Sequence, residues 1–251
     1  MASDPIVEQL RGSPLFAHAG EGALADIARY LRRRRYRRGE VIFERGDPGD
    51  TLHLVRSGAV KIVLPSPEGE EAIIATLRRG DTFGELALLD GEPRSAAAVA
   101  LEPCETWTLA RDRFRELLDR DPGLRDALLA GLARELRRLT DQVEELHFLD
   151  LAGRLATRLA RLAREAAPGS RAVRLDWPYT QSDLAAMIGG TRQSVNKLLS
   201  GFVERGLLVI ERDSLLIPDV DALDPEKALG FDNPIWPHRD DPIWLHPRPV
   251  S

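Results

Sequence analysis

In the first half of the chain, residues 83–97 read Phe83-Gly84-Glu85-Leu86-Ala87-Leu88-Leu89-Asp90-Gly91-Glu92-Pro93-Arg94-Ser95-Ala96-Ala97. A short helix is predicted to open at Gly84 and Glu85, and the free backbone N–H groups at its start would attract an anion. Arg94 can donate two hydrogen bonds to phosphate oxygens, and Glu85 can accept one from a sugar hydroxyl. This combination suits a cyclic ribose phosphate. A buried Arg94–Glu85 ion pair that ties the loop to its domain is the alternative that spacing alone leaves open.

Short β-type runs separated by glycine turns surround this segment, from about residue 39 to residue 109. The clearest runs are residues 41–43, 52–55, 60–64 and 72–75. Regular short strands of this kind predict an all-β sandwich or a jelly-roll barrel.

Arginines fill positions 32–35 and 37–38, just before these runs. A second nucleic-acid patch is one interpretation. A solvated face or intersubunit contacts are favoured, because the segment lies where a helix leads into the first strand of the barrel.

A long helix is predicted from about residue 122 to residue 148. Its apolar residues recur every three or four positions and form one continuous stripe. They are Leu124, Leu128, Leu132, Leu136, Leu139, Val143 and Leu146. Toward the end the spacing alternates between four and three, as in the seam of a coiled coil. Packing on its own domain is the alternative, but dimerisation is favoured because a helix this long overhangs one small barrel.

Two short capped helices joined by a glycine turn are predicted between residues 180 and 199. Thr180 can cap the first helix, with Asp183 three positions later. Gly189 and Gly190 end that helix, and Thr191 can cap the next one. This is the pattern of a helix-turn-helix. Residues 207–210 and 215–217 then predict a β-hairpin wing.

Composition limits the classes of protein to consider. The 251 residues carry a net charge of −5, but residues 151–220 hold ten Arg and Lys against seven Asp and Glu, so basic charge is local. The single cysteine, Cys104, rules out an internal disulfide and a four-thiolate zinc or iron–sulfur site within one chain. No apolar run approaches 18 residues and the first residues lack a signal-peptide pattern, so a cytoplasmic location without membrane contact is expected.

Beyond residue 226 the chain holds a repeat with a period of eight residues: Asp232-Asn233-Pro234-Ile235-Trp236-Pro237-His238, then Asp240-Asp241-Pro242-Ile243-Trp244-Leu245-His246. Proline density excludes an ordinary helix there. An arm that packs on its own protein is favoured, and recognition of a partner is the alternative. A metal site at His238 and His246 is disfavoured, because no thiolate or carboxylate cluster supports it.

Residues 83–97 resemble the phosphate-binding cassette of cyclic-nucleotide-binding domains. Together with the glycine-spaced strands, the striped helix, the hinge at residues 147–154 and the helix-turn-helix, they make residues 15–219 similar to the cAMP receptor protein/fumarate-nitrate reductase regulator family of bacterial transcription factors. The resemblance implies a cyclic nucleotide ligand, such as cAMP or cGMP, and no metal.

The resemblance also implies ligand residues. These are Gly84, Glu85, Leu86, Ala87, Arg94, Ser95, Leu139 and Thr140. In cAMP-responsive members a Thr, and then a Ser from the partner subunit, contact the adenine, and a gapless count places Leu139 and Thr140 at these positions. The missing Thr leaves cGMP, cyclic di-GMP or a relaxed pocket open. A haem-sensing branch would need a placed histidine, and structural or solvent-facing roles are favoured for His53 and His147.

For DNA, the resemblance places Arg192, Gln193 and Lys197 at the three main base-reading positions, where the familiar family set is Arg, Glu and Arg. The second helix of such a motif enters the major groove, and Asn196 shares its exposed face. Candidate phosphate contacts that would fix the register are Thr180, Gln181, Thr191 and Ser194.

The predicted fold class is α+β. The predicted domains are a jelly-roll sensor (1–121), a dimerisation helix (122–149), a winged helix-turn-helix (150–225) and the tail (226–251). The predicted function is a homodimeric, nucleotide-controlled regulator that binds a pseudo-palindromic DNA site, with RNA polymerase as a further partner. A same-fold regulator that binds DNA constitutively or responds to cyclic di-GMP, and an adaptor that acts on a protein through the tail, are the alternatives. No enzyme is expected, because no catalytic triad, metal cluster or P-loop lysine is present.

Overall fold

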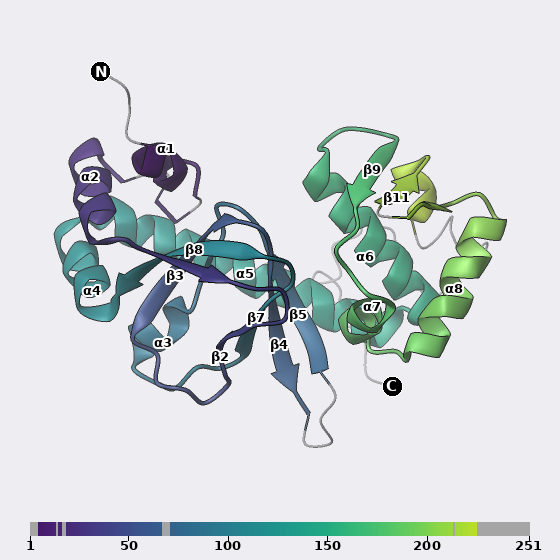
Figure 1. Ribbon diagram of the computed structural model, residues 1–251, viewed down its shortest axis with the longest axis horizontal. Helices are drawn as coiled ribbons and strands as arrows, with labels where there is room; N and C mark the ends of the chain where they lie inside the picture. Colours follow the sequence, from purple (N-terminus) through teal and green to yellow (C-terminus); the bar gives the residue numbers. More distant parts are fainter. Residues whose placement is uncertain (1–4, 14, 17–18, 67–70, 213, 225–251) are drawn as a thin grey trace, which may run out of the picture. The chain divides into compact units, whose positions relative to one another are not determined.

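A computed structural model describes residues 5–13, 15–16, 19–66, 71–212 and 214–224 (Figure 1). The predicted tail, with its Trp repeat and its two histidines, lies outside the described residues. The chain divides into two compact units, one of residues 1–148 with 177–196 and one of residues 149–176 with those from 197 on. The domain boundaries predicted from the sequence differ from the boundaries of these two units, and they stay predictions.

The first unit is built on two four-stranded antiparallel sheets (Figure 1). One sheet has the order β1-β8-β3-β6, with β1 Arg32–Tyr36, β8 Cys104–Ala110, β3 Thr51–Ser57 and β6 Thr82–Phe83. The other has the order β2-β7-β4-β5, with β2 Val41–Phe43, β7 Ala97–Ala100, β4 Val60–Pro65 and β5 Glu71–Leu77. Buried residues of both sheets, among them Val55, Val60 and Phe83, share one core cluster. This confirms the predicted all-β sandwich or barrel within an α+β chain.

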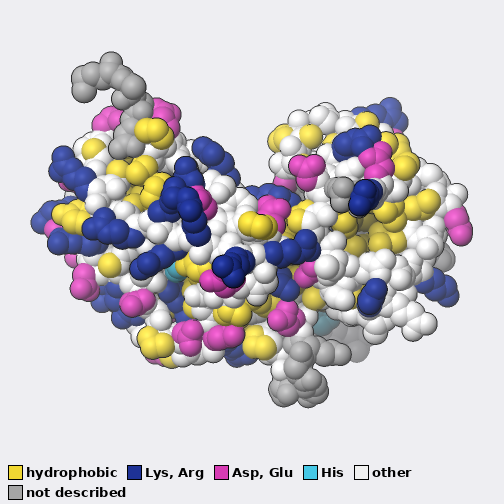
Figure 2. Space-filling view, in the orientation of Figure 1, with side chains coloured by type: hydrophobic (Ala, Val, Ile, Leu, Met, Phe, Trp, Pro, Cys, Tyr) yellow, Lys and Arg dark blue, Asp and Glu magenta, His cyan; other side chains and the backbone are white. Residues whose placement is uncertain are grey.

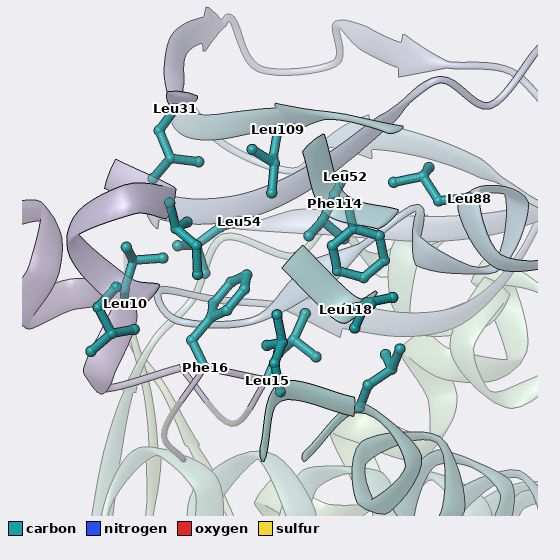
Figure 3. Close-up of a cluster of buried hydrophobic side chains, with 14 of the residues drawn as sticks. Leu10, Leu15, Phe16, Leu31, Leu52, Leu54, Leu88, Leu109, Phe114 and Leu118 are labelled. Carbon is teal, nitrogen blue, oxygen red and sulfur yellow. The ribbon is translucent and has the colours of Figure 1, made fainter. Parts of the chain in front are cut away.

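Helices close one side of this sandwich around a larger core. They are α1 Pro5–Arg11, α2 Glu21–Tyr30, α4 Arg111–Arg120 and the first turns of α5 Pro122–Phe148. Phe16 and Phe114 are almost fully buried among leucines of β3 and β8, and Figure 3 shows these side chains converging from the helices and the sheet. Burial of this kind stabilises by roughly 1.5–3 kcal/mol for each large side chain, so the core fixes the start of α5 on the barrel.

The predicted long helix is confirmed, with bounds Pro122–Phe148, but its apolar stripe has two parts. Leu124 and Leu128 are buried in the core, and Leu132 packs against it. Farther along, Leu136 is 67% exposed and Val143 55% exposed. The apolar stripe therefore packs on the core only at its beginning, and within the described residues Leu136 and Val143 are largely exposed.

The predicted caps of the helix-turn-helix are confirmed. In α7 Gln181–Ile188, the Asp183 N–H donates to Thr180 Oγ1 (3.0 Å) and the Thr180 N–H donates to Asp183 Oδ2 (2.9 Å). Gly189 ends α7 in the left-handed conformation, with φ of 71°. The following helix, α8 Arg192–Glu204, begins where the Ser194 N–H donates to Thr191 Oγ1 (3.1 Å).

The second unit contains α6 Leu151–Ala166, which buries Leu155 and Leu159 and is capped by Asp150. A three-stranded sheet has the order β10-β11-β9, with β10 Val209–Ile210, β11 Ser214–Ile217 and β9 Val173–Asp176. A 3₁₀ turn at Val220–Leu223 follows. The sequence predicts β10 and β11 as the wing but not β9, because its four residues are too few to show a period on their own.

Asp183 ties α7 together and also contacts the barrel within the first unit, where Lys61 Nζ of β4 lies 3.1 Å from Asp183 Oδ1. Burial raises the pKa of the Asp183 carboxyl, but hydrogen bonds from Thr180 and Lys61 outweigh burial and hold this pKa below its ordinary value of 3.8. A carboxyl with a lowered pKa stabilises the folded state at neutral pH, and the stabilisation is lost as pH falls through the folded-state pKa.

We therefore expect Asp183→Ala to lower the free energy of unfolding at pH 7 by about 1–2 kcal/mol, because it removes a cap and a charged acceptor. Urea denaturation followed by circular dichroism measures the change. The difference from the wild type should shrink when the pH falls below 3.8, the ordinary pKa of the carboxyl. Ser182→Ala, at an exposed neighbouring position, is the control; an equal loss in both variants would contradict the role of the cap.

Candidate functional site

The predicted cassette of residues 83–97 forms the connection between β6 and β7. The helix predicted to open at Gly84 and Glu85 is present as α3 Glu85–Asp90. Gly84 precedes it in the left-handed conformation, with φ of 82°, and a Cβ added there would collide with Nη1 of Arg94. Only glycine allows this approach of the backbone to the guanidinium.

Arg94 is the central polar group of the cassette and is only 4% exposed. Its Nη1 donates to the Gly84 carbonyl (2.6 Å) and its Nη2 to the Thr51 carbonyl (2.7 Å), while the guanidinium lies 4.2 Å from the centre of the Phe43 ring. Nε of Arg94 has no hydrogen-bond partner. Burial lowers the pKa of Arg94, and the charges of Asp50 and Glu85 oppose this shift.

The alternative of a buried Arg94–Glu85 ion pair is not what the described residues show. The guanidinium of Arg94 hydrogen-bonds to backbone carbonyls and to the Thr51 hydroxyl (3.3 Å). Neutral carbonyls bind Nη1 and Nη2, but within the described residues no bonded counter-ion neutralises the positive charge. A buried cation of this kind is costly unless an anion joins it.

Glu85 lies beside this cation at the start of α3. Burial raises the pKa of its carboxyl, and the negative charge of Glu135 on α5 raises it further. Of the other predicted cassette residues, Ala87 is buried against Gly49, whereas Leu86 and Ser95 are exposed. The structure thus brings Gly84, Glu85 and Arg94 together and leaves Leu86 and Ser95 at the rim.

His53 packs behind the cassette. Its ring stacks on Phe83 with centroids 4.8 Å apart, and it is buried. Burial, and then the positive charge of Arg94, lower the pKa of His53 to about 3, so the imidazole is neutral at physiological pH. This packing agrees with the structural role favoured for His53 from the sequence.

On α5, the predicted ligand residues Leu139 and Thr140 offer few polar atoms to a ligand. Leu139 is 37% exposed and apolar, and the Thr140 hydroxyl donates to the Leu136 carbonyl one turn earlier (3.0 Å). Two neighbours that the sequence analysis missed carry the polar contacts instead. Arg138 Nη1 (3.0 Å) and Gln142 Nε2 (3.1 Å) both donate to the carbonyl of Ile74 on β5. Their spacing of four residues, which places two donors on one helix face, is the signal that could have found them.

Two further polar residues of the cassette region were missed. The Thr51 carbonyl and hydroxyl hold Arg94, and Arg111 Nη2 donates to the Ala87 carbonyl (2.8 Å) and to the Gly49 carbonyl. No local sequence signal marks Thr51, because its contact joins positions 43 residues apart.

The predicted DNA-reading face of α8 is exposed. Arg192, Gln193, Asn196 and Lys197 are accessible, whereas Val195, Leu199 and Phe202 are buried on the opposite face. Gln181 of α7 hydrogen-bonds to Asn196 and accepts from Arg192 Nε (3.4 Å). Thr191 and Ser194 bond to each other (2.9 Å), and the side chain of Thr180 is engaged in the helix cap. The polar residues of the two helices therefore form one connected surface.

Four arginines of the arginine-rich segment, residues 32–35, lie in strand β1 and are exposed. Arg33 (3.9 Å), Arg35 (2.8 Å) and Arg56 surround one carboxylate, Glu105. Figure 2 shows Lys and Arg side chains on the face it draws, with Asp and Glu side chains interspersed. These contacts agree with the interpretation of a solvated face.

Within the described part of the chain, no helix is long and apolar enough to cross a membrane. No group of three or more His, Cys, Asp or Glu side chains in that part is arranged to hold a metal ion. Cys104 is buried, and burial raises the pKa of its thiol to about 11.

Comparison with known proteins supports both halves of this description. Residues 33–121 match the model of the cyclic nucleotide-binding domain, and residues 153–225 match that of the Crp-like helix-turn-helix domain. The chain is 34% identical over 217 residues to the CRP-like cAMP-activated global transcriptional regulator of Mycobacterium tuberculosis, a match that covers 86% of this chain and 97% of that protein. It is 36% identical over 223 residues to the cyclic AMP receptor protein of Thermus thermophilus, a match that covers 88% of this chain and 100% of that protein.

Among solved structures, the c-di-GMP responsive global regulator CLP of Xanthomonas campestris is similar. The TM-score is 0.68 at 25% identity, over 79% of this chain and 99% of that one. The matched relatives are transcription regulators rather than enzymes. With the predicted cassette formed and the predicted helix-turn-helix capped, the chain belongs to the cAMP receptor protein/fumarate-nitrate reductase regulator family of bacterial transcription factors.

Proposed function

We propose that the protein is a homodimeric regulator whose binding to a pseudo-palindromic DNA site is controlled by a cyclic nucleotide in the N-terminal barrel. The observation that carries nucleotide control is the buried charge of Arg94, which among the described residues hydrogen-bonds only to neutral groups. A phosphate diester is the anion that suits it, because two of its oxygens can take the two N–H donors now held by carbonyls.

The remaining ligand contacts follow from the cassette. Glu85 accepts from a ribose hydroxyl, and the backbone from Gly84 to Ala87 lines the ribose and the phosphate. Ser95 at the rim supports the phosphate, and the base lies toward Leu139 and Thr140 of α5. The two curated relatives are named for cAMP, whereas the solved relative is named for c-di-GMP, so cAMP, cGMP and cyclic di-GMP are the ligands to test.

Arg94→Ala tests the site. We expect it to weaken nucleotide binding by about 10- to 100-fold, because it removes a buried charge-assisted contact. Isothermal titration calorimetry of the full chain with cAMP, cGMP and cyclic di-GMP measures the change. Arg113→Ala, which removes an exposed arginine on α4, is the matched control. If binding of the tightest ligand is equal in the two variants, the phosphate does not lie at Arg94.

Dimerisation follows from the exposed part of the α5 stripe. Leu136, Leu139, Val143 and Leu146 continue the seam past the point where the core ends. The spacing of four and three residues suits a second copy of the same helix, since each residue can insert between residues of its partner.

We expect the double variant Leu136→Glu/Val143→Glu to be monomeric at micromolar concentration, because two carboxylates would be buried without partners in the seam. Analytical ultracentrifugation measures the change. Arg137→Glu, at an exposed position beside the stripe, should leave the dimer intact. A dimeric double variant, or a monomeric wild type, would reject this interface.

DNA binding is assigned to the exposed face of α8. Arg192 and Lys197 suit guanine O6 and N7, and Gln193 suits adenine. Phosphate contacts that fix the register are assigned to Thr180, Gln181, Thr191 and Ser194, and Asn196 joins the same surface. In a dimer the two α8 helices would lie about 34 Å apart, which matches successive major grooves. Nucleotide contacts would favour one of two settings of the hinge near Phe148 and so shift the population toward DNA binding.

The double variant Arg192→Ala/Lys197→Ala should lose a symmetric footprint on the target site, and its residual DNA affinity should depend less steeply on salt, because two cationic contacts are absent. Footprinting and fluorescence anisotropy over a range of salt concentrations measure this. Ser200→Ala, exposed on the same helix, is the control. An unchanged footprint would remove α8 from the DNA interface.

Constitutive DNA binding is the second candidate, favoured by the apolar Leu139 at the expected adenine-reading position. Under this candidate function, the affinity for DNA would be the same with and without nucleotide, and the substitution Arg94→Ala would not change it. RNA polymerase stays a proposed partner on the strength of the family alone.

A further inference from the structure

The far end of the proposed ligand site is marked by an irregularity in the sheet. The pairing of β4 with β5 shifts register, with Ile62 opposite Ala75 and Val63 opposite Ile73, so that Ile74 is skipped. Such a bulge leaves backbone groups outside the ladder and is frequent beside functional sites. Here the Ile74 carbonyl accepts from two side chains of α5, Arg138 and Gln142.

Arg138 is held in a defined orientation. Its Nε donates to Glu135 Oε2 (2.8 Å) and its Nη2 to Glu135 Oε1, so the carboxylate grips one edge of the guanidinium. Nη1 is aimed at the Ile74 carbonyl. The side chain of Arg138 is 27% exposed, so its fork is partly shielded from water.

Arg138 lies on the turn of α5 that carries the predicted base contacts, because Leu139 and Thr140 are the next two residues of the helix. From this turn Arg138 reaches β5 of the barrel, where Nη1 donates to the Ile74 carbonyl. Glu135, one turn earlier, also acts electrostatically on the carboxyl of Glu85 in the cassette. A nucleotide whose phosphate is held by Arg94 would extend its base toward Arg138.

The chemistry of a guanidinium discriminates between bases. Guanine presents two adjacent acceptors, O6 and N7, and arginine can donate to both. Adenine replaces O6 by an amino group, and arginine has no acceptor to offer it. The neighbouring Leu139 has no polar atom either, whereas the amide of Gln142 can donate and accept and so fits both bases.

We propose that Arg138 is the specificity-determining residue of the sensor and makes it selective for guanine cyclic nucleotides, with Glu135 as its positioning residue. The inference rests on the proposed nucleotide control. On binding, Nη1 of Arg138 leaves the Ile74 carbonyl, and Nη1 together with the second N–H of Nη2 donates to the two acceptors of the base, while Nε and the first N–H of Nη2 stay on Glu135. The shared ligand chemistry is a guanosine with a cyclic phosphodiester, and cGMP and cyclic di-GMP are its two sources.

Calorimetric titration of the full chain with cGMP, cyclic di-GMP and cAMP tests the inference. We expect at least one guanine ligand to bind about tenfold or more tightly than cAMP. Arg138→Leu should weaken that guanine ligand by about tenfold or more and leave cAMP within about twofold, since a good bidentate contact discriminates by roughly that factor. Arg138→Lys keeps the charge but loses the fork, and should lose most of the preference as well. Arg137→Ala, on the exposed side of the same turn, should keep it.

The outcomes separate the inference from the proposed function. Tighter binding of cGMP, or of cyclic di-GMP, identifies which source the site takes. Equal or tighter binding of cAMP, or a guanine preference that survives in both Arg138 variants with unchanged melting temperatures, overturns the role of Arg138 and leaves nucleotide control standing. Failure of all three ligands to bind the wild type overturns the inference and nucleotide control together.

Discussion

The contact on which the N-terminal unit depends is that between the Arg94 guanidinium and the carbonyls of Gly84 and Thr51. Arg94 is joined to the start of α3 and, across 43 residues of sequence, to β3. The contact holds a positive charge in the interior beside the neutral ring of His53. A carbonyl satisfies an N–H group but does not neutralise the cation. Within the described residues two guanidinium nitrogens of Arg94 are hydrogen-bonded, Nε has no partner and the positive charge is not neutralised, which is the condition under which an anion gains most from entering.

The apolar pattern of helix α5 is continuous, but its first turns are buried and its later turns are exposed. Its first turns are buried because α4, β3 and the N-terminal helices surround Leu124 and Leu128. The same periodicity continues past Leu132, where no residue of the described chain covers Leu136 or Val143 to the same degree. The spacing of the apolar residues of α5 does not show which surface they pack against. The extent of the core shows which of them are buried within the chain.

Features that depend on neighbouring residues were predictable. The capping box at Thr180 and Asp183, the glycine stop at Gly189 and the bounds of α5 all follow from short local spacings. Features that depend on strand pairing were not. Strand β9 is ordered by its pairing with β11, which lies far along the chain. Likewise, Arg138 and Gln142 gain their acceptor only because β4 and β5 shift register at Ile74, a position 64 residues before Arg138. The sequence shows the donors, but the acceptor is created by the fold.

Both ends of the proposed ligand site share one arrangement, an arginine that rests on a backbone carbonyl. At Arg94 a ligand would replace neutral carbonyls by a charged phosphate, so the guanidinium would gain an ion pair in addition to its hydrogen bonds. At Arg138 a base oxygen would replace the Ile74 oxygen, and both are neutral, so the exchange itself gains little. Adenine would instead bring an amino group, so that its N–H donors face the N–H donors of Arg138. The unpaired donors would cost more binding free energy than the matched base gains. Affinity in this site would thus arise at Arg94, whereas selectivity would arise at Arg138 through the penalty on the wrong base.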